Sequence, residues 1–206
     1  MDAANITLVL VIVTALAFDF TNGFHDTANA MATPIATGAL KPRTAVAIAA
    51  IMNLIGAFLS TEVAKAISVS LINEGVVIVP EMVFAGLTGA ILWNLTTWFL
   101  GLPSSSSHAL FGGLVGAAIV FAGFAAINSD AIIQKVIIPA LAAPLIAGLA
   151  AFLTTRIAYF ITARTQLARA KTGIGTGRDT FKIGQLFSSS LLALSHGTND
   201  AQKTMG

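Results

Sequence analysis

Long apolar segments alternate with short polar ones along this 206-residue chain. The longest apolar stretches are residues 6–21, 44–60, 82–100, 109–127, 136–155 and a last one from 183 onward. Most of them are about as long as a helix that crosses the hydrocarbon core of a bilayer, roughly 17–20 residues, and none alternates as the strand of a membrane barrel does. The pattern therefore predicts an all-α, polytopic transmembrane helical bundle.

Composition supports a membrane protein. The chain is 56% hydrophobic and only 10% charged, with a mean hydropathy of +0.86, whereas a soluble domain carries about 25% charged residues. It contains no cysteine, which excludes disulfides and thiolate metal sites. No basic residue precedes the first apolar run, so we expect this run to be a permanent span and not a cleaved signal peptide. These features predict a multi-pass protein of the cell membrane, surrounded by lipid and without a nucleic-acid partner.

The placement of charged residues predicts the orientation of the spans. Lys41, Arg43 and the basic stretch 156–182 should face the cytoplasm, because cytoplasmic loops are enriched in Lys and Arg. The acidic loop 73–81 and the N-terminus should then face outside. The segment 82–127 begins and ends on the outer side, so it forms either two full spans or a re-entrant hairpin with a serine run at its tip. Counting spans does not choose between these alternatives.

A polar cluster occurs twice within this apolar sequence. Residues 23–30 read GFHDTANA and residues 197–204 read GTNDAQKT, so both copies have a Gly, a spacer, a His or Asn, and then an Asp. Ionisable groups are costly within hydrocarbon and are rarely retained there without a function. Two related clusters indicate an internal repeat, which is the usual architecture of secondary transporters. We therefore expect a transporter that handles a charged solute.

The first cluster is suited to a small cation. Asp26 and Asn29 are three residues apart and so share one helical face. A carboxylate and an amide oxygen on one face suit Na⁺ or a titrating proton. Gly23 and Pro34 could break the helix and free backbone carbonyls, while His25 should point elsewhere if the helix is continuous. The alternative is that Asp26 lies in an interfacial turn and that His25 is a hydrogen-bonded core residue.

The serine run is suited to an anion. Residues 103–108 read PSSSSH and precede an apolar helix. Serine is a favoured N-cap, and the free N–H groups and positive dipole end of a helix attract phosphate or sulfate. The alternative is a plain N-cap in a loop. His25, His108 and His196 all lie in or beside the polar segments, but they are far apart in sequence and no cysteine supports them, so we expect no dedicated metal site.

Other functional classes fit less well. A channel would need a continuous polar stripe along its spans, whereas the polar residues here are concentrated in separate segments. An intramembrane enzyme is not expected, because no Ser-His-Asp or His-x-x-x-His arrangement is present. Four further polar residues lie in apolar surroundings and serve either helix–helix hydrogen bonds or a solute path: Asp19, Asn22, Asn53 and Asn94.

Three motifs together resemble the inorganic phosphate transporter (PiT) family. They are GFHDTANA at residues 23–30, GLPSSSSH at 101–108 and SHGTNDAQK at 195–203, and the resemblance covers the whole chain. It implies a symporter that carries inorganic phosphate across the cytoplasmic membrane with H⁺ or Na⁺, without any other cofactor. It also implies inverted repeats, each of which pairs an Asn-Asp motif with a serine- or threonine-tipped helical hairpin.

The resemblance also assigns roles to residues. The phosphate-binding residues would be Ser105, Ser106 and Ser107. The coupling-cation residues would be Asp26, Asn29, Asn199 and Asp200. The accessory residues would be His25, Thr27, Gln202 and Lys203.

Two departures from the family pattern favour H⁺ as the coupling ion. His25 stands where many members have Asn, and imidazole changes its charge near physiological pH. Lys203 stands where the first cluster has Asn29, and its charge disfavours a second cation by Coulomb repulsion. We therefore expect H⁺-coupled phosphate symport, with Na⁺ coupling or transport of a related oxyanion such as sulfate as alternatives.

The resemblance divides the chain into parts of a longer transporter. Residues 1–163 would be the first transmembrane repeat with the hairpin 82–127, residues 164–182 a basic cytoplasmic loop whose glycines disfavour a helix, and residues 183–206 the start of the second repeat. A further hairpin and several spans are expected beyond Gly206. The expected partners are therefore inorganic phosphate, the lipid bilayer and a C-terminal half, with a homodimer of this chain as an alternative.

Overall fold

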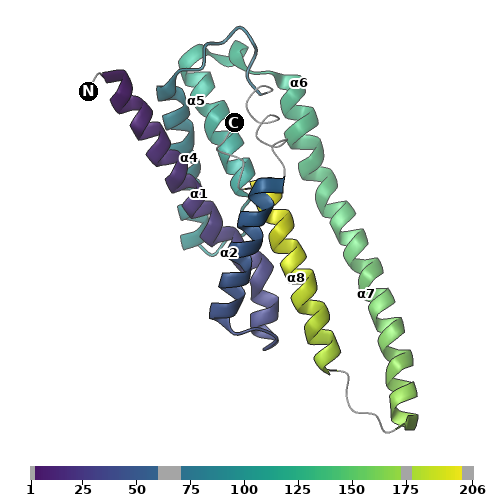
Figure 1. Ribbon diagram of the computed structural model, residues 1–206. Helices are drawn as coiled ribbons and strands as arrows, with labels where there is room; N and C mark the ends of the chain where they lie inside the picture. The colour runs from purple at the N-terminus through teal and green to yellow at the C-terminus, as the bar shows by residue number, and fades with distance from the viewer. Residues whose placement is uncertain (1–2, 60–70, 173–177, 201–206) are drawn as a thin grey trace. The chain divides into compact units, whose positions relative to one another are not determined.

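The computed structural model describes residues 3–59, 71–172 and 178–200, and its regular elements are helices (Figure 1). The longer ones are α1 (Ala3–Ala36), α2 (Pro42–Leu59), α4 (Pro80–Phe99), α5 (Ser106–Ala122), α7 (Ile138–Thr172) and α8 (Arg178–Asp200). The short ones are η1 (Phe124–Ala126), α6 (Ser129–Ile132) and the π-helical η2 (Ile133–Ile137). Within the described ranges the β-structure is one isolated antiparallel bridge between Ile72 and Ile127. The prediction of an all-α protein is confirmed.

Several helices have the length and composition of membrane spans. Four stretches qualify among the described residues: Asn5–Ala36, Pro42–Leu59, Pro80–Phe99 and Ser129–Arg164. Large apolar side chains cover their surfaces, and Phe58, Phe99 and Leu145 are 83%, 83% and 76% exposed. A surface of this kind is stable against lipid and not against water. The chain is a multi-pass membrane protein, as its sequence predicts.

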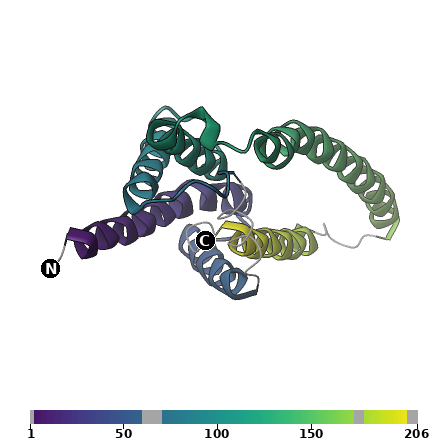
Figure 2. The same ribbon diagram turned by 90° about the horizontal axis from the view of Figure 1, so that it is seen from above.

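The structure forms two compact units, Met1–Ser129 with Ile183–Gly206 and Asp130–Lys182. In the first unit α1 lies between the pair α4–α5 on one side and α2 and α8 on the other (Figure 2). The second unit is nearly continuous helix, in which α6 leads through η2 into α7. The expected loop 164–182 is helical up to Thr172 and again from Arg178, because Ala, Gln, Arg and Lys are good helix formers. Residues 173–177 lie outside the described ranges.

Helices α4 and α5 form the expected hairpin. Their backbones approach closely because both contain glycine at the crossing. A Cβ on Gly113 would overlap the carbonyl oxygen of Gly86, and a Cβ on Gly86 would lie 2.8 Å from the Leu114 side chain. At the open end, the Asn73 N–H donates to Ala126 O at 2.9 Å. The segments before and after the hairpin thus meet on one side, as the predicted topology requires.

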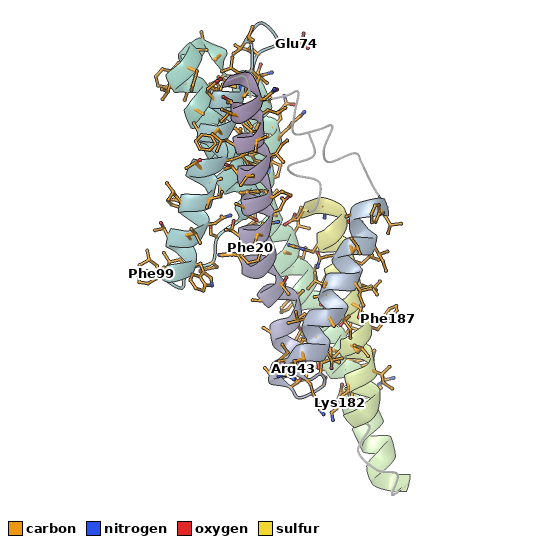
Figure 3. All side chains as sticks on the ribbon, turned by 60° about the vertical axis from the view of Figure 1, so that its left-hand side comes forward. Phe20, Arg43, Glu74, Phe99, Lys182 and Phe187 are labelled. Atoms are coloured by element: carbon orange, nitrogen blue, oxygen red, sulfur yellow. The ribbon has the colours of Figure 1, made fainter. Side chains whose placement is uncertain are left out.

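The hairpin ends beside the middle of α1. Phe18 of α1 is fully buried in a cluster with four hairpin residues, Leu87, Ala90, Ala109 and Leu110. At the tip, Ser106 reaches Asp26, which at 1.5 Å per residue lies about 15 Å before the end of α1. The tip of the hairpin therefore lies at the level of the first polar cluster. Glu74 and Arg43 lie at opposite ends of the unit, in agreement with the predicted orientation (Figure 3).

Candidate functional site

The face of α1 toward the hairpin carries the first polar side chains of the site. Phe18, Asn22 and Asp26 are spaced by four residues, so they lie along one face of the helix. Helix α1 passes through Gly23 and Pro34 without a break, so the expected interruption is wrong. The Thr27 hydroxyl donates to the Gly23 carbonyl, which keeps this oxygen within the helix. Side chains, and not carbonyls freed by a broken helix, form the site here.

Ser105 and Ser106 have different surroundings at the hairpin tip. Ser105 is exposed and caps α5, where its hydroxyl accepts from the His108 N–H at 3.4 Å and lies 2.9 Å from His108 Nδ1. Ser106 is 1% exposed. Its hydroxyl lies 2.9 Å from Asp26 Oδ2 and also hydrogen-bonds to Asn22 Oδ1. The plain N-cap interpretation thus describes Ser105, while Ser106 joins the serine run to the first polar cluster.

Asp26 lies where three elements meet. Besides its contact with Ser106 of the hairpin, its Oδ1 lies 3.2 Å from His25 Nδ1 on its own helix. Its Oδ2 lies 3.5 Å from His196 Nε2 on α8. The expectation that His25 points elsewhere in a continuous helix is wrong, because neighbouring side chains on the same turn reach each other through their flexible ends.

His196 connects the second polar cluster to the first. Its Nε2 lies 3.0 Å from Asp200 Oδ2, and its Nδ1 lies 2.7 Å from Asn53 Oδ1 of α2. The backbones of α2 and α8 come close here. A Cβ on Gly197 would lie 2.6 Å from Asn53 Cα, and a Cβ on Gly56 would lie 2.5 Å from Leu194 O. Glycine at the crossing therefore brings His196 within reach of both α1 and α2.

A cavity of about 290 Å³ adjoins these side chains. Its lining comes from α1, α2 and α8 and consists of Asp19, Asn22, Gly23, Thr27, Ala50, Asn53, His196 and Asp200. The lining contains two carboxylates and three amide or imidazole groups within otherwise apolar helices. This space is large enough for a small hydrated ion.

Two side chains of this lining, His196 and Asp200, could hold a cation together with Asp26. Ligand atoms of Asp26, His196 and Asp200 all lie within 4.8 Å of one another. Two carboxylates and an imidazole suit a proton or a metal cation. The sequence argument against a dedicated metal site depended on the separation of the histidines along the chain, and the fold brings His25 and His196 to the same carboxylate. The absence of a resident metal stays a prediction.

The structure brings some predicted site residues together and leaves others apart. Ser106, Asp26, His25, Thr27 and Asp200 lie at or beside the cluster described above. Asn199 is exposed, and Ser107 is half-buried on α5. The side chain of Asn29 and all of Gln202 and Lys203 lie outside the described part of the chain.

Sequence reasoning did not select Asn22, Asn53 and His196 as site residues. Asn22 precedes Asp26 by four positions and His196 precedes Asp200 by four, so each lies one helical turn before a carboxylate of its cluster. This shared spacing could have indicated that Asn22 and His196 belong to the site. No sequence pattern indicates the contact with Asn53, because it depends on the crossing of α2 and α8.

The described fold is a bundle of helices long and apolar enough to span a membrane, with a helical hairpin and a charged site, which is typical of a secondary transporter. Comparison with known families is specific: the pattern of the Phosphate transporter family matches residues 22–206. The chain belongs to this family, which is one of transporters and not of enzymes.

Curated relatives carry names that agree with the family. A "Probable low-affinity inorganic phosphate transporter" of Mycobacterium tuberculosis (strain CDC 1551 / Oshkosh) is 55% identical over 97% of this chain and 46% of its own length. One of Streptomyces halstedii is 46% identical over 95% of this chain and 88% of its own. PitB of Escherichia coli is 36% identical over 97% and 44%. The chain thus spans about half the length of most of these relatives.

A solved structure has a similar fold. It is titled "The sodium-dependent phosphate transporter", and the two superpose with a TM-score of 0.76 over 96% of this chain and 65% of that one. The sequence identity is 18%, so the likeness is one of fold.

Proposed function

We propose that this chain forms part of a symporter that carries inorganic phosphate together with H⁺ across the cell membrane. In this proposal the hairpin serines Ser105, Ser106 and Ser107 bind the anion. Asp26, Asp200 and His196 take up the coupling proton. The family and the names of its curated members support phosphate as the solute.

The contact between Ser106 and Asp26 carries this proposal. It places a hydroxyl donor suited to an anion 2.9 Å from a carboxylate suited to a cation, although the two residues are 80 positions apart. An anion and a cation bound side by side neutralise each other, which lowers the cost of holding either within hydrocarbon. Adjacent sites for an anion and a cation can couple the binding of the two ligands, as symport needs.

Two imidazoles beside one carboxylate support H⁺. His25 and His196 approach the two oxygens of Asp26 at 3.2 and 3.5 Å. A carboxylate between two imidazoles offers several atoms that can hold one proton, as the Asp and His chains of proton-coupled transporters do. The alternative is Na⁺, which the carboxylate oxygens of Asp26 and Asp200 would coordinate.

Uptake of radiolabelled phosphate tests the proposal. The full natural reading frame that includes this chain is reconstituted in proteoliposomes, and uptake is measured in Na⁺-free buffer with an imposed pH gradient. We expect saturable uptake that a protonophore abolishes and that excess sulfate does not inhibit. Uptake that requires Na⁺ and ignores the pH gradient would reverse the choice of ion, and strong competition by sulfate would change the solute.

Asp26→Asn should abolish coupled uptake without loss of membrane insertion, because the amide cannot take up the proton. Asp130→Asn is the matched control: it makes the same chemical change at an exposed residue of α6. Normal uptake by Asp26→Asn at several pH values would remove this carboxylate from the mechanism.

A further inference from the structure

The Ser106 hydroxyl faces two acceptor oxygens. It lies 2.9 Å from Asp26 Oδ2 and hydrogen-bonds to Asn22 Oδ1 as well. A hydroxyl has a single proton to donate, so it cannot donate to both at once. An amide can present either its oxygen or its nitrogen, and with Nδ2 turned toward Ser106 the Asn22 side chain donates while Ser106 donates to Asp26. Each group then has a complementary partner.

This arrangement is held firmly. Ser106 is 1% exposed and Asn22 is 4% exposed. Leu110 lies one helical turn after Ser106, and Phe18 lies one turn before Asn22. These two side chains belong to the buried cluster between the hairpin and α1. Ser106 therefore has little freedom to turn toward water, and its proton goes to whichever acceptor of the site is available.

We propose that Asn22 is a positioning residue that makes phosphate binding at Ser106 depend on the charge state of Asp26. While Asp26 is an unoccupied carboxylate, it takes the Ser106 proton and also repels an approaching anion. When a cation binds at Asp26, the Ser106 proton is released. Asn22 continues to donate to Ser106 Oγ, so the hydroxyl keeps its orientation and points its proton toward the anion.

This relay from Asn22 through Ser106 to Asp26 rests on the proposed function and adds to it a coupling between the two ligands. A cation at Asp26 strengthens phosphate binding, and by thermodynamic reciprocity phosphate strengthens cation binding by the same factor. Couplings of this kind are typically about 5- to 150-fold. The relay explains how the occupancy of the cation group at Asp26 changes the affinity of the anion group at Ser106 beside it.

The test measures this coupling and not activity alone. Phosphate KM is determined for the full natural reading frame in proteoliposomes at low and at saturating concentrations of the coupling cation, with H⁺ and Na⁺ tried separately. The readout is the phosphate KM at the low cation concentration divided by the phosphate KM at the saturating one. In the wild type we expect a ratio well above one for one of the two cations.

Asn22→Leu keeps the size of the side chain and removes its hydrogen bonds, so the ratio should fall toward one. Asn22→Ser, which retains a short donor, should restore part of it. Thr21→Val is the matched control, because Thr21 is buried next to Asn22 and its hydroxyl donates to its own helix at Phe18 O. Its ratio should equal that of the wild type.

A purely structural role for Asn22 would lower the protein level or raise both KM values equally and leave the ratio unchanged. An unchanged ratio in Asn22→Leu would therefore overturn the relay but would leave the proposed phosphate transport intact. If Asn22→Leu does not insert, Asn22→Ser decides: its ratio should lie between one and the wild-type value, and a wild-type ratio would overturn the relay. A wild-type protein that takes up no phosphate rejects the proposed function itself.

Discussion

The imidazole Nδ1 of His196 lies 2.7 Å from the amide oxygen of Asn53, although the two residues are 143 positions apart. The Asn53 amide is oriented by its own Nδ2, which donates to Ala49 O at 2.9 Å. Because the amide oxygen only accepts, the proton of this contact belongs to Nδ1. The other nitrogen, Nε2, is therefore the atom that faces Asp26 and Asp200.

Replacing Asn53 by Leu should disturb this orientation. The side chain keeps its approximate size but no longer accepts from His196, and an unsatisfied buried group costs about 1–3 kcal/mol. We expect phosphate uptake per transporter to fall roughly tenfold or more, with a changed pH dependence and normal insertion. Initial rates measured at several pH values check this. An unaltered pH profile would mean that His196 is oriented without α2.

The two serines at the hairpin tip should respond differently to alanine. Ser106→Ala removes a buried donor and should raise the phosphate KM by roughly 10- to 100-fold, because a hydrogen bond to a charged group is worth about 1.5–3 kcal/mol. Ser105→Ala should raise the KM less and lower stability by about 1 kcal/mol through loss of the α5 cap. Uptake kinetics and thermal unfolding in detergent separate the two effects. A double alanine variant with the wild-type KM would show that the run serves only as a cap.

The hairpin should tolerate alanine at one of two adjacent glycines and not at the other. A Cβ on Gly113 would overlap the Gly86 carbonyl, whereas a Cβ on Gly112 would have nothing within 4 Å. Overpacking typically costs about 1–3 kcal/mol, so Gly113→Ala should lower the unfolding temperature clearly and Gly112→Ala should not. Equal unfolding temperatures for both variants would contradict the close contact of α4 and α5.

Single cysteines test the predicted orientation, since the natural chain has none. A cysteine at Thr172, at the end of α7, should resist an impermeant thiol reagent added outside intact cells. A cysteine at the exposed Glu74 should react with it. Labelling at position 172 and protection at position 74 would invert the topology.

Much of the fold follows from the sequence alone. The apolar runs correspond to the helices, and the run of Ser104 to Ser107 marks the hairpin tip, because apolar length and serine capping are local properties. The length of the predicted loop 164–182 was too great, because charged residues are equally suited to exposed helices. The continuity of α1 was also missed, since Gly23 and Pro34 are tolerated in a long helix supported by its neighbours.

The site was predictable only in part. The repeated clusters singled out Asp26 and Asp200, and the structure does bring both to His196. The roles of Asn22 and Asn53 depend on which helix faces which. Asn22 meets Ser106 because α1 packs on the hairpin, and Asn53 meets His196 because α2 crosses α8. No pattern in one segment contains this information.

The crossing of α2 and α8 has a consequence for the glycine that opens the second cluster. The Gly197 backbone rests on the backbone of Asn53, so even a methyl group there would push the two helices apart. His196 would then withdraw from Asn53, and Asp200 would withdraw from Asp26 with it. The separation between the carboxylates of Asp26 and Asp200 thus depends on the absence of a side chain at position 197.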